Sequence, residues 1–355
     1  MRRSNNMAKK KVKSDFEDMK NKIDESFEFD DEDFGDIEEK KQQLSRNKNY
    51  GHKIFFIAVA AVFLICVISL LIWNRGQRIH IDPNEDTSEF DTEPNDYVQP
   101  LTNDQLQGKP DDGILTILTL GNSPFADNGS DNYLCNELAS VTKADLMINA
   151  SIPDSYQSRT KAAGDYSNPV DGISLYDVVS GLVNGDVSNV ISSAESVSEQ
   201  AYEKAQRLQG IDMSSVDCIV ISYDLNDYID HRNIYNPFDD DDVATFCGAL
   251  SASVKLIQQN YPYIRIVVLS VPACGKTIDD YYVDGTTIDL ANGTLNDYLG
   301  SEVATCATCG VSFIDLYFGV INVDTRDKYL VDDYHINEAG AKAVAERFDK
   351  LITLN

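Results

Sequence analysis

The stretch "ILTILTLGNSPFADNG", Ile114 to Gly129, places an apolar, β-branched run directly before the small polar triplet Gly121, Asn122 and Ser123. A short apolar run that ends at such a turn is typical of a strand buried on both faces. In a parallel sheet, the residues just beyond the carboxyl end of a strand lie where ligands bind. Ser123 is therefore a candidate nucleophile, with a turn residue or helix cap as the simpler interpretation.

Beyond Gly113 the chain alternates short apolar runs with longer segments of helical spacing. The other apolar runs, rich in Val and Ile, are 144–150, 217–223, 264–271 and 311–317. Helical spacing occurs at 198–208, 239–259 and 337–352. Buried strands separated by helices indicate a parallel sheet with right-handed crossovers. We therefore expect a three-layer α/β/α domain over residues 113–355, with a sheet of five strands.

Residues 54–73, "IFFIAVAAVFLICVISLLIW", are uncharged and match the roughly 20 residues that a helix needs to cross a bilayer. This run is too long for a signal peptide, and no cleavage site follows it. Lys and Arg are more frequent on its N-terminal side, which places the N-terminus in the cytoplasm. The sequence thus predicts a single-pass cell-membrane protein with a transmembrane helix at 54–73 and an extracytoplasmic domain.

The segments on either side of this run lack the apolar periodicity of a folded core. Residues 1–53 mix basic and acidic clusters and predict a disordered cytoplasmic tail, with a docking motif as the alternative. Residues 74–112 are rich in Asp, Glu, Asn and Pro and predict an acidic, extended linker.

The chain carries 58 acidic and 30 basic residues, a net charge of −28. Acidic and basic residues balance up to Lys53, so the excess negative charge belongs to the part beyond it. Such a surface argues against nucleic acid, which binds through Lys and Arg, and mildly against anionic membranes.

A serine nucleophile needs a base, and the chain has 4 histidines. The predicted domain holds His231 and His335, and His335 lies in "LVDDYHINEAG" with Asp332 three residues before it. A turn can bring this carboxylate to the imidazole and fix the tautomer that accepts a hydroxyl proton. The simpler interpretation is that Asp332 or Asp333 lies in an ordinary loop and that His335 only precedes a helix.

The third apolar run ends in "YDLNDY", where the Asn226 amide can point towards an oxyanion. The backbone N–H groups of Ser123 and of the loop near Ser151 can complete such a site. Asn and Asp are also common turn residues, so this motif is weak by itself. Ser, Asn and Asp-x-x-His, each at the end of a predicted element, together indicate an acyl-transfer site.

These motifs resemble those of the SGNH/GDSL hydrolases over roughly residues 113–354. Residues 121–123 resemble the first block of the family, residues 224–227 the third, and Asp332 with His335 the last. The resemblance implies a flavodoxin-like fold in which Ser123 is the nucleophile, His335 the base, Asp332 its orienting partner and Asn226 an oxyanion donor.

The sequence departs from the family pattern at three positions: Asn122 replaces an Asp, Asp224 replaces a Gly, and Ser151 stands where the second block has a Gly. Asp224 adds a carboxylate near a site meant to stabilise negative charge. Tyr228 and His231 follow the third block and are candidate substrate-binding residues, with a surface loop as the alternative.

The sequence therefore predicts an extracytoplasmic serine esterase acting on short, O-acetyl-like esters of cell-surface or extracellular carbohydrate. One alternative is an inactive SGNH-like domain that binds glycan or a protein partner. Another is a lipid or lysophospholipid esterase, which the acidic surface disfavours.

No cofactor is expected, since no phosphate-binding or dinucleotide-binding glycine motif occurs. Cys306-x-x-Cys309 lacks the second ligand pair of a zinc site, so no metal is expected either. A disulfide is allowed outside the cell. Cys135, Cys218 and Cys247 fall inside predicted elements and are expected to be small buried hydrophobic residues.

Overall fold

The computed structural model describes residues 93–354 except 111, 127–132, 164–165, 224–225 and 279–280, together with Val59, Val62 and Leu64. Residues 93–354 belong to one compact unit, Phe90–Asn355. Apart from the three separate residues, which are helical, the predicted tail (1–53), the membrane segment (54–73) and the linker up to residue 92 lie outside the described residues. Within the described part, no helix has the length and apolar character that crossing a membrane requires.

The central sheet has five parallel strands in the order β2-β1-β3-β4-β7. Each strand overlaps one of the apolar runs of the sequence, so the predicted five-stranded parallel sheet is confirmed. The strands are β1 (Thr116–Gly121), β2 (Leu146–Asn149), β3 (Cys218–Ser222), β4 (Arg265–Leu269) and β7 (Ser312–Ile314).

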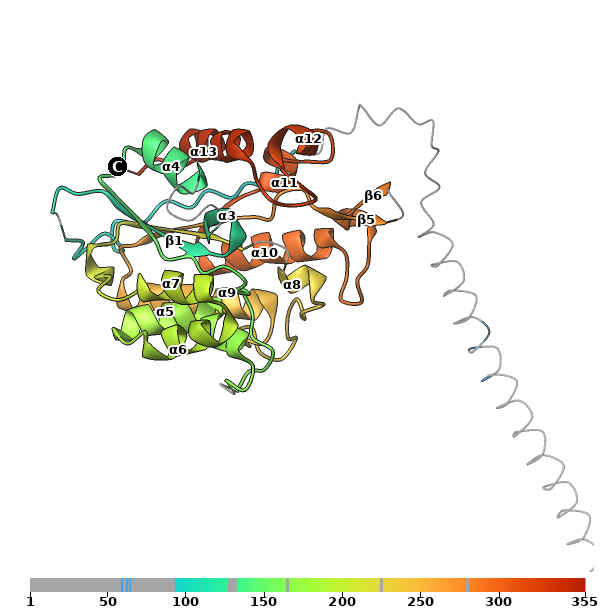
Figure 1. Cartoon of the computed structure of the whole chain (residues 1–355), viewed down its shortest axis with the longest axis horizontal. Coiled ribbons are helices and arrows are strands. Elements are labelled where there is room, and N and C mark those ends of the chain that lie inside the picture. Colours follow the sequence, from blue (N-terminus) through green and yellow to red (C-terminus); the bar gives the residue numbers. More distant parts are fainter. Residues whose placement is uncertain are drawn as a thin grey trace, which may run out of the picture. The chain divides into compact units, whose positions relative to one another are not determined.

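Helices cover both faces of the sheet and complete the predicted three layers (Figure 1). One face packs on α4 (Tyr133–Thr142) and α13 (Glu338–Leu351). The other face packs on α5 (Leu175–Asn184), α6 (Ser188–Val197), α7 (Glu199–Gln206) and α9 (Phe246–Asn260). Successive strand residues alternate between the two cores, as the period of a strand requires.

The predicted helix over 239–259 is correct in its body but wrong at its start, because α9 begins at Phe246. Thr245 is the N-cap, and its Oγ1 accepts the N–H of Gly248 at 3.1 Å. The carbonyl of Asp242 accepts the N–H of Thr245 at 2.9 Å, which turns the chain just before the helix. The acidic run 239–242 therefore lies in a loop, because a capping threonine defines a helix start more strongly than negative charge does.

A short antiparallel hairpin, β5 (Gly275–Ile278) and β6 (Tyr281–Asp284), follows β4 and was not anticipated from the sequence. A 3-10 turn at Gly285–Thr287 continues from it, and α10 (Leu295–Cys309) comes next. Figure 1 shows the hairpin at the same side of the view as the short helices α8 (Asn226–Ile229), α11 (Leu316–Gly319) and α12 (Arg326–Tyr329). The hairpin thus belongs to the region where the carboxyl ends of the strands emerge.

The folded unit also extends upstream of the boundary expected at Gly113. Tyr97 forms an antiparallel bridge with Phe313 of β7, with N···O distances of 2.9 and 2.7 Å. Asp96 pairs with Arg347 of α13, and Gln99 N–H donates to the Ser312 hydroxyl. Part of the segment predicted to be a linker is therefore bound to the edge of the sheet.

The six cysteines among residues 93–354 are all free thiols. Cys135, Cys218 and Cys247 are buried in the core between the sheet and the layer of α4 and α13, which confirms the prediction that they act as small hydrophobic residues. Burial raises the pKa of the Cys218 and Cys247 thiols to about 12. These thiols are therefore poor nucleophiles near neutral pH.

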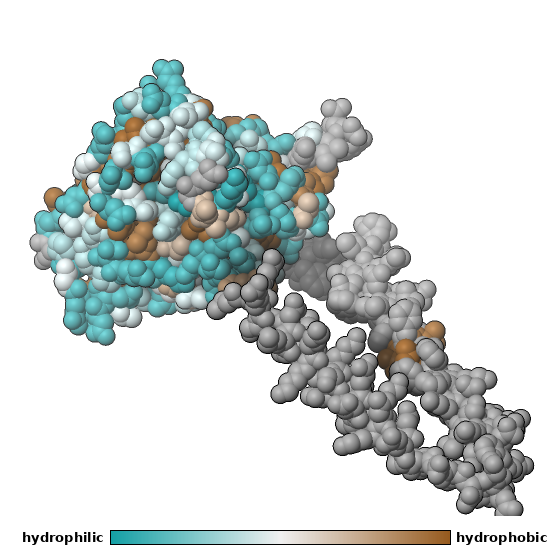
Figure 2. Space-filling view, turned by 90° about the horizontal axis from the view of Figure 1, so that it is seen from below, coloured by the Kyte–Doolittle hydropathy of each residue, from teal (hydrophilic) through white to brown (hydrophobic). Residues whose placement is uncertain are grey.

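The face of the molecule in Figure 2 is mainly hydrophilic, with small and separate apolar areas. Single large apolar side chains are exposed on the described surface, among them Phe238, which is 96% exposed, and Val331, which is 70% exposed. Isolated exposed apolar residues are normal on soluble domains and need no special role.

Candidate active site

Ser123 lies at the carboxyl end of β1, as the sequence predicts, and begins the short helix α3 (Ser123–Ala126). The N–H groups of Phe125 and Ala126 both donate to the carbonyl of Asn122, at 3.0 and 2.7 Å, which closes the turn. Ser123 is half-buried, and its hydroxyl makes no hydrogen bond with any described residue. The turn thus presents a small hydroxyl at the edge of a buried sheet.

Gly121 is what allows β1 to pass so close to β3 before this turn. Its φ is +153°, and a Cβ added there would lie 1.9 Å from the carbonyl oxygen of Ser222. We expect Gly121→Ala to lower the free energy of unfolding by about 1–3 kcal/mol, because the strand ends must separate to admit a methyl group. Urea denaturation measures this change. Gly300→Ala is the control: its added Cβ meets no atom within 4 Å, and its stability should be unchanged or slightly higher.

Two asparagine side chains from neighbouring strand ends converge on one carbonyl. Asn122 Nδ2 donates to the carbonyl of Ser155 at 3.0 Å, and Asn226 Nδ2 donates to the same oxygen at 3.1 Å. This shared acceptor joins the β1 turn, the loop after β2 and the start of α8. An amide nitrogen carries two N–H groups, so the bond to Ser155 does not by itself exclude the predicted role of Asn226 as an oxyanion donor.

The loop that supplies this carbonyl is held by Asp227, a residue whose role the sequence did not reveal. Its buried carboxylate accepts the N–H of Gln157 at 2.8 Å, and both the N–H and the hydroxyl of Ser158, at 3.0 and 2.5 Å. Burial raises the pKa of Asp227 to about 6, although these hydrogen bonds oppose the shift. Asp227 therefore positions Ser155, and through it both asparagines.

The N–H of Ser151, an expected oxyanion donor, has a hydrogen-bond partner within the protein. Its N–H donates to Asn149 Oδ1 at 3.1 Å, and its side chain is buried. The neighbouring Asp154 is exposed, has φ +59°, and uses its N–H in no hydrogen bond within the described part. Asp154 is therefore a further candidate backbone donor on this loop. The Pro-Asp pair at 153–154 is a turn signal, from which this position could have been predicted in the sequence.

Asp332 and His335 form the pair that their spacing predicts. Asp332 Oδ2 lies 2.6 Å from His335 Nδ1, and Oδ1 accepts the N–H groups of Tyr334 and His335 at 3.0 and 2.8 Å. Burial alone would raise the pKa of Asp332, but the hydrogen bonds from Tyr334 and His335 outweigh it and hold the pKa below its usual value. The carboxylate is therefore ionised near neutral pH, as an orienting partner for an imidazole must be.

The loop that carries this pair is closed at its base and connects α12 to α13. Leu330 and Ile336 form an antiparallel bridge, and Val331 N–H donates to the carbonyl of His335 at 2.8 Å. The Tyr334 ring lies against the imidazole, with 4.1 Å between ring centroids. The imidazole is therefore fixed by its carboxylate, its backbone and a neighbouring ring.

No hydrogen bond joins Ser123 to His335 within the described residues. In enzymes without substrate, the nucleophile and the base are often further apart than in the reacting complex. The missing hydrogen bond therefore does not decide the role of either residue. The role of Ser123 stays a prediction, and Asp224 lies outside the described residues.

Tyr228 and His231, the expected substrate-binding residues, differ in position. Tyr228 is 5% exposed, and its hydroxyl donates to the carbonyls of Gly285 and Ile288 at 3.0 and 2.7 Å, so its contacts are with the protein. His231 is exposed in a left-handed conformation, with φ +57°. The polar end of Tyr228 is thus already engaged, whereas His231 remains accessible.

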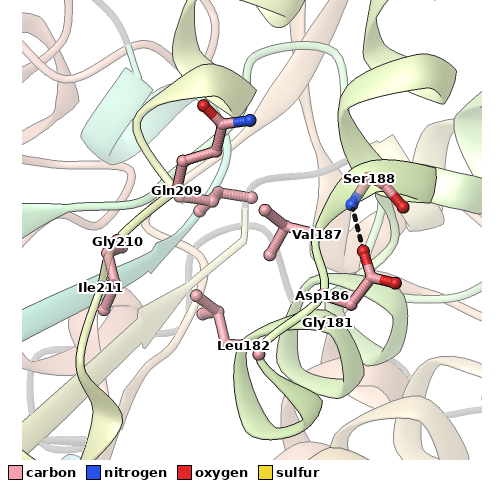
Figure 3. Close-up of a pocket in the computed structure, with 10 residues that line it drawn as sticks. Gly181, Leu182, Asp186, Val187, Ser188, Gln209, Gly210 and Ile211 are labelled. Carbon is pink, nitrogen blue, oxygen red and sulfur yellow. Dashed lines mark hydrogen bonds between the residues drawn. The ribbon is translucent and has the colours of Figure 1, made fainter.

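The cavity drawn in Figure 3 is lined by none of these residues. It measures about 310 Å³ and is lined by the end of α5, the start of α6 and residues 208–211, with Asp186 accepting the N–H of Ser188 at 3.0 Å. A second cavity of about 200 Å³ lies between α9 and α10. The linings of both cavities lack Ser123, Asn226 and His335.

No protein-family model and no curated protein matches this chain. Several solved structures are similar to it. A possible lipase from Chitinophaga pinensis is 12% identical, covers 66% of this chain and 96% of its own, and has a TM-score of 0.42. A putative GDSL-like lipase from Bacteroides ovatus is 14% identical, with coverages of 67% and 97% and a TM-score of 0.40. Phospholipase A1 from Streptomyces albidoflavus is 12% identical, with coverages of 67% and 100% and a TM-score of 0.39.

Proposed function

We propose that this chain is a serine ester hydrolase. The observation that carries the proposal is the contact of 2.6 Å between Asp332 Oδ2 and His335 Nδ1, made by an ionised carboxylate that two backbone N–H groups hold in place. This contact leaves the imidazole with Nε2 as the atom that exchanges protons. A hydroxyl at the carboxyl end of β1 and an amide at the start of α8 supply the other groups that acyl transfer needs.

In the proposed reaction, Ser123 Oγ forms a bond to the ester carbonyl carbon while its proton passes to His335. The oxyanion is held by the N–H of Ser123, by Asn226 and by the N–H of Asp154. The bond to the alcohol oxygen then breaks, and His335 returns the proton to the leaving alcohol. Water repeats the sequence on the acyl-enzyme and releases the acid.

Short acyl esters on extracellular carbohydrate are the proposed substrates. This choice rests on the sequence: an apolar run at 54–73 that predicts a membrane anchor, and an acidic domain beyond it. The decisive experiment is hydrolysis of p-nitrophenyl acetate, butyrate and octanoate by the purified full chain, with Ser123→Ala as the blank. A preference for acetate supports the short-chain proposal, a preference for octanoate supports a lipid esterase, and no turnover above the blank contradicts an esterase.

A non-catalytic domain that binds glycan or a protein partner is the second candidate, and one observation favours it. The N–H of Ser151, an oxyanion donor expected from the sequence, donates to Asn149 Oδ1 at 3.1 Å. Labelling of the full chain with a fluorophosphonate separates the two candidates, because only an activated serine reacts.

A further inference from the structure

The Asp227 carboxylate ties the loop after β2 to α8, the helix that begins with Asn226. Oδ2 accepts the N–H of Gln157 at 2.8 Å, and Oδ1 accepts the N–H and the hydroxyl of Ser158 at 3.0 and 2.5 Å. Asp227 is 1% exposed, and Gln157 and Ser158 are buried as well. Because water does not compete with these bonds, each of them holds the loop strongly.

The three bonds require an ionised carboxylate. Each oxygen faces a backbone N–H group, which can only donate, and only the Ser158 hydroxyl can reverse its role. A proton on either oxygen makes that oxygen a weaker acceptor and adds a donor to a buried site. Protonation of Asp227 therefore weakens or breaks at least one bond to the loop.

The same loop orients the two asparagine amides beside the candidate nucleophile. The Ser155 carbonyl, two residues before Gln157, accepts Asn122 Nδ2 at 3.0 Å and Asn226 Nδ2 at 3.1 Å. Asn122 directly precedes Ser123 in the β1 turn. Since a side-chain amide is planar, a bond through one of its N–H groups fixes the direction of the other. The place of the Ser155 carbonyl therefore sets where the second N–H of Asn226 points.

We propose that ionised Asp227 is a positioning residue of the oxyanion site, holding residues 155–158 so that the Ser155 carbonyl aims the Asn226 amide at the transition state. The inference rests on the proposed esterase function. Asp227 does not touch the substrate in this account, because its carboxylate is buried and bonded to the loop.

The loop has other anchors, so a neutral residue at position 227 shifts it without releasing it. Gln157 Nε2 donates to the carbonyl of Phe246 at the start of α9, at 2.9 Å. The Tyr156 carbonyl accepts the N–H of Leu175 at the start of α5, at 3.2 Å. A substitution of Asp227 is therefore expected to change the direction of the Asn226 amide rather than unfold the site.

The charge of Asp227 changes in an experimentally accessible pH range. Burial raises its pKa to about 6, although its bonds to the loop and the positive charge of Arg232 beyond α8 oppose the shift. The other described ionisable groups that interact with it lie on the loop after β2, on α9 and on α10: Tyr156, Cys247, Tyr298 and Glu302. Burial raises the pKa of all four, that of Glu302 to about 8, so they are mainly neutral between pH 5 and pH 7. Within this set, Asp227 is the group that changes charge in that interval.

The test compares Asp227→Asn with wild type, both as full chains, on p-nitrophenyl acetate at half-unit steps from pH 5 to pH 8. The amide mimics the protonated carboxyl at every pH. Above pH 7 we expect kcat of the variant to be roughly 10- to 100-fold lower with KM little changed, the effect of a misdirected transition-state contact. The ratio of the two kcat values should approach one at pH 5, with a midpoint near pH 6. Protonation of His335 lowers both rates alike and cancels in the ratio.

Two further variants separate positioning from a general loss of structure. Asp315→Asn changes another buried carboxylate that accepts backbone N–H groups, those of Asn95 and Phe318, and that makes no hydrogen bond to residues 155–158. Its kcat should match wild type at every pH. Ser158→Ala removes one of the three bonds and decides the question if Asp227→Asn does not fold. Its loss in kcat should be about three- to tenfold above pH 7 and should disappear at pH 5.

A double variant tests the path through the asparagine amide. Asn226→Ala removes the group on which Asp227 is inferred to act. In that background, Asp227→Asn should lower kcat by a further threefold at most, or about that, because coupled residues are not additive. A full additional loss would show that Asp227 acts by another route.

The outcomes separate the inference from the function on which it depends. A kcat ratio that does not vary with pH, or a loss confined to KM, overturns the role of Asp227 while leaving the esterase in place. Absence of wild-type turnover on p-nitrophenyl acetate, butyrate and octanoate overturns the proposed function and the inference with it. A loss in kcat that disappears near pH 5 and is absent from the Asn226→Ala background supports both.

Discussion

The Ser123→Ala variant should lose roughly 10⁴- to 10⁶-fold in kcat/KM for p-nitrophenyl acetate while unfolding at the wild-type denaturant concentration. The activity falls because no other group can form the acyl-enzyme bond. Stability is retained because the hydroxyl is half-buried and makes no hydrogen bond within the described part, so its removal leaves no partner unsatisfied. Initial rates and urea denaturation measure the two quantities.

Variants of the Asp332–His335 pair provide the comparison that identifies the mechanism. His335→Ala should match Ser123→Ala, and the double variant should be no less active than either single variant, since the two residues act as one unit. Asp332→Asn should lose roughly 10⁴-fold, because an amide at 2.6 Å from Nδ1 favours the wrong tautomer. Near wild-type rates in Ser123→Ala or His335→Ala would show that other residues catalyse the hydrolysis.

The second large effect concerns stability and comes from Glu302, a buried carboxyl in α10. Glu302 is 3% exposed, and its Oε2 has no hydrogen-bond partner among the described residues. Burial raises its pKa to about 8, and the nearby Asp227 and Asp315 add to the shift. The folded protein therefore keeps this group protonated under conditions in which the unfolded chain releases the proton.

The direction of the pH effect follows from this difference. From about pH 4.5 to about pH 8 the folded state binds one more proton at Glu302 than the unfolded state, so the free energy of unfolding falls as pH rises. At 1.36 kcal/mol per pH unit, the loss is on the order of 5 kcal/mol over this range. Glu302→Gln removes this contribution, so its stability should fall less steeply with pH.

Urea denaturation at half-unit steps from pH 5 to pH 9 measures this slope for wild type and variant. Glu346→Gln, an exposed change of the same kind in α13, should follow the wild-type curve. Parallel curves for wild type and Glu302→Gln would mean that water or a rearranged neighbour stabilises the charged carboxylate.

The sheet was predictable because its inner strands, β1, β3 and β4, are buried on both faces. Runs such as 114–120 and 217–223 carry apolar residues at five of seven positions, on both faces of the strand, a pattern that half-exposed strands do not show. The Asp332–His335 pair was predictable for a similar reason, since a spacing of three residues before a helix is a local property. Structural features that depend on residues close together in the sequence can therefore be predicted from the sequence.

The remaining features depend on contacts between distant segments. The side-chain amides of Asn122 and Asn226 both donate to the Ser155 carbonyl, which is 33 and 71 residues away from them in the sequence. No local sequence pattern predicts these two hydrogen bonds. The engaged N–H of Ser151 likewise depends on where the Asn149 side chain turns. The hairpin formed by β5 and β6 is too short and too polar to be predicted as a pair of strands from the sequence.

The strand-like segment around Tyr97 has a consequence for aggregation. It pairs with β7, the last strand of the sheet, and so covers an edge that otherwise presents open N–H and C=O groups to another molecule. A chain shortened to begin at Gly113 loses this cover and leaves Arg347 without the Asp96 carboxylate. Such a chain should self-associate more readily than the full chain in light scattering, although its active-site residues are all present.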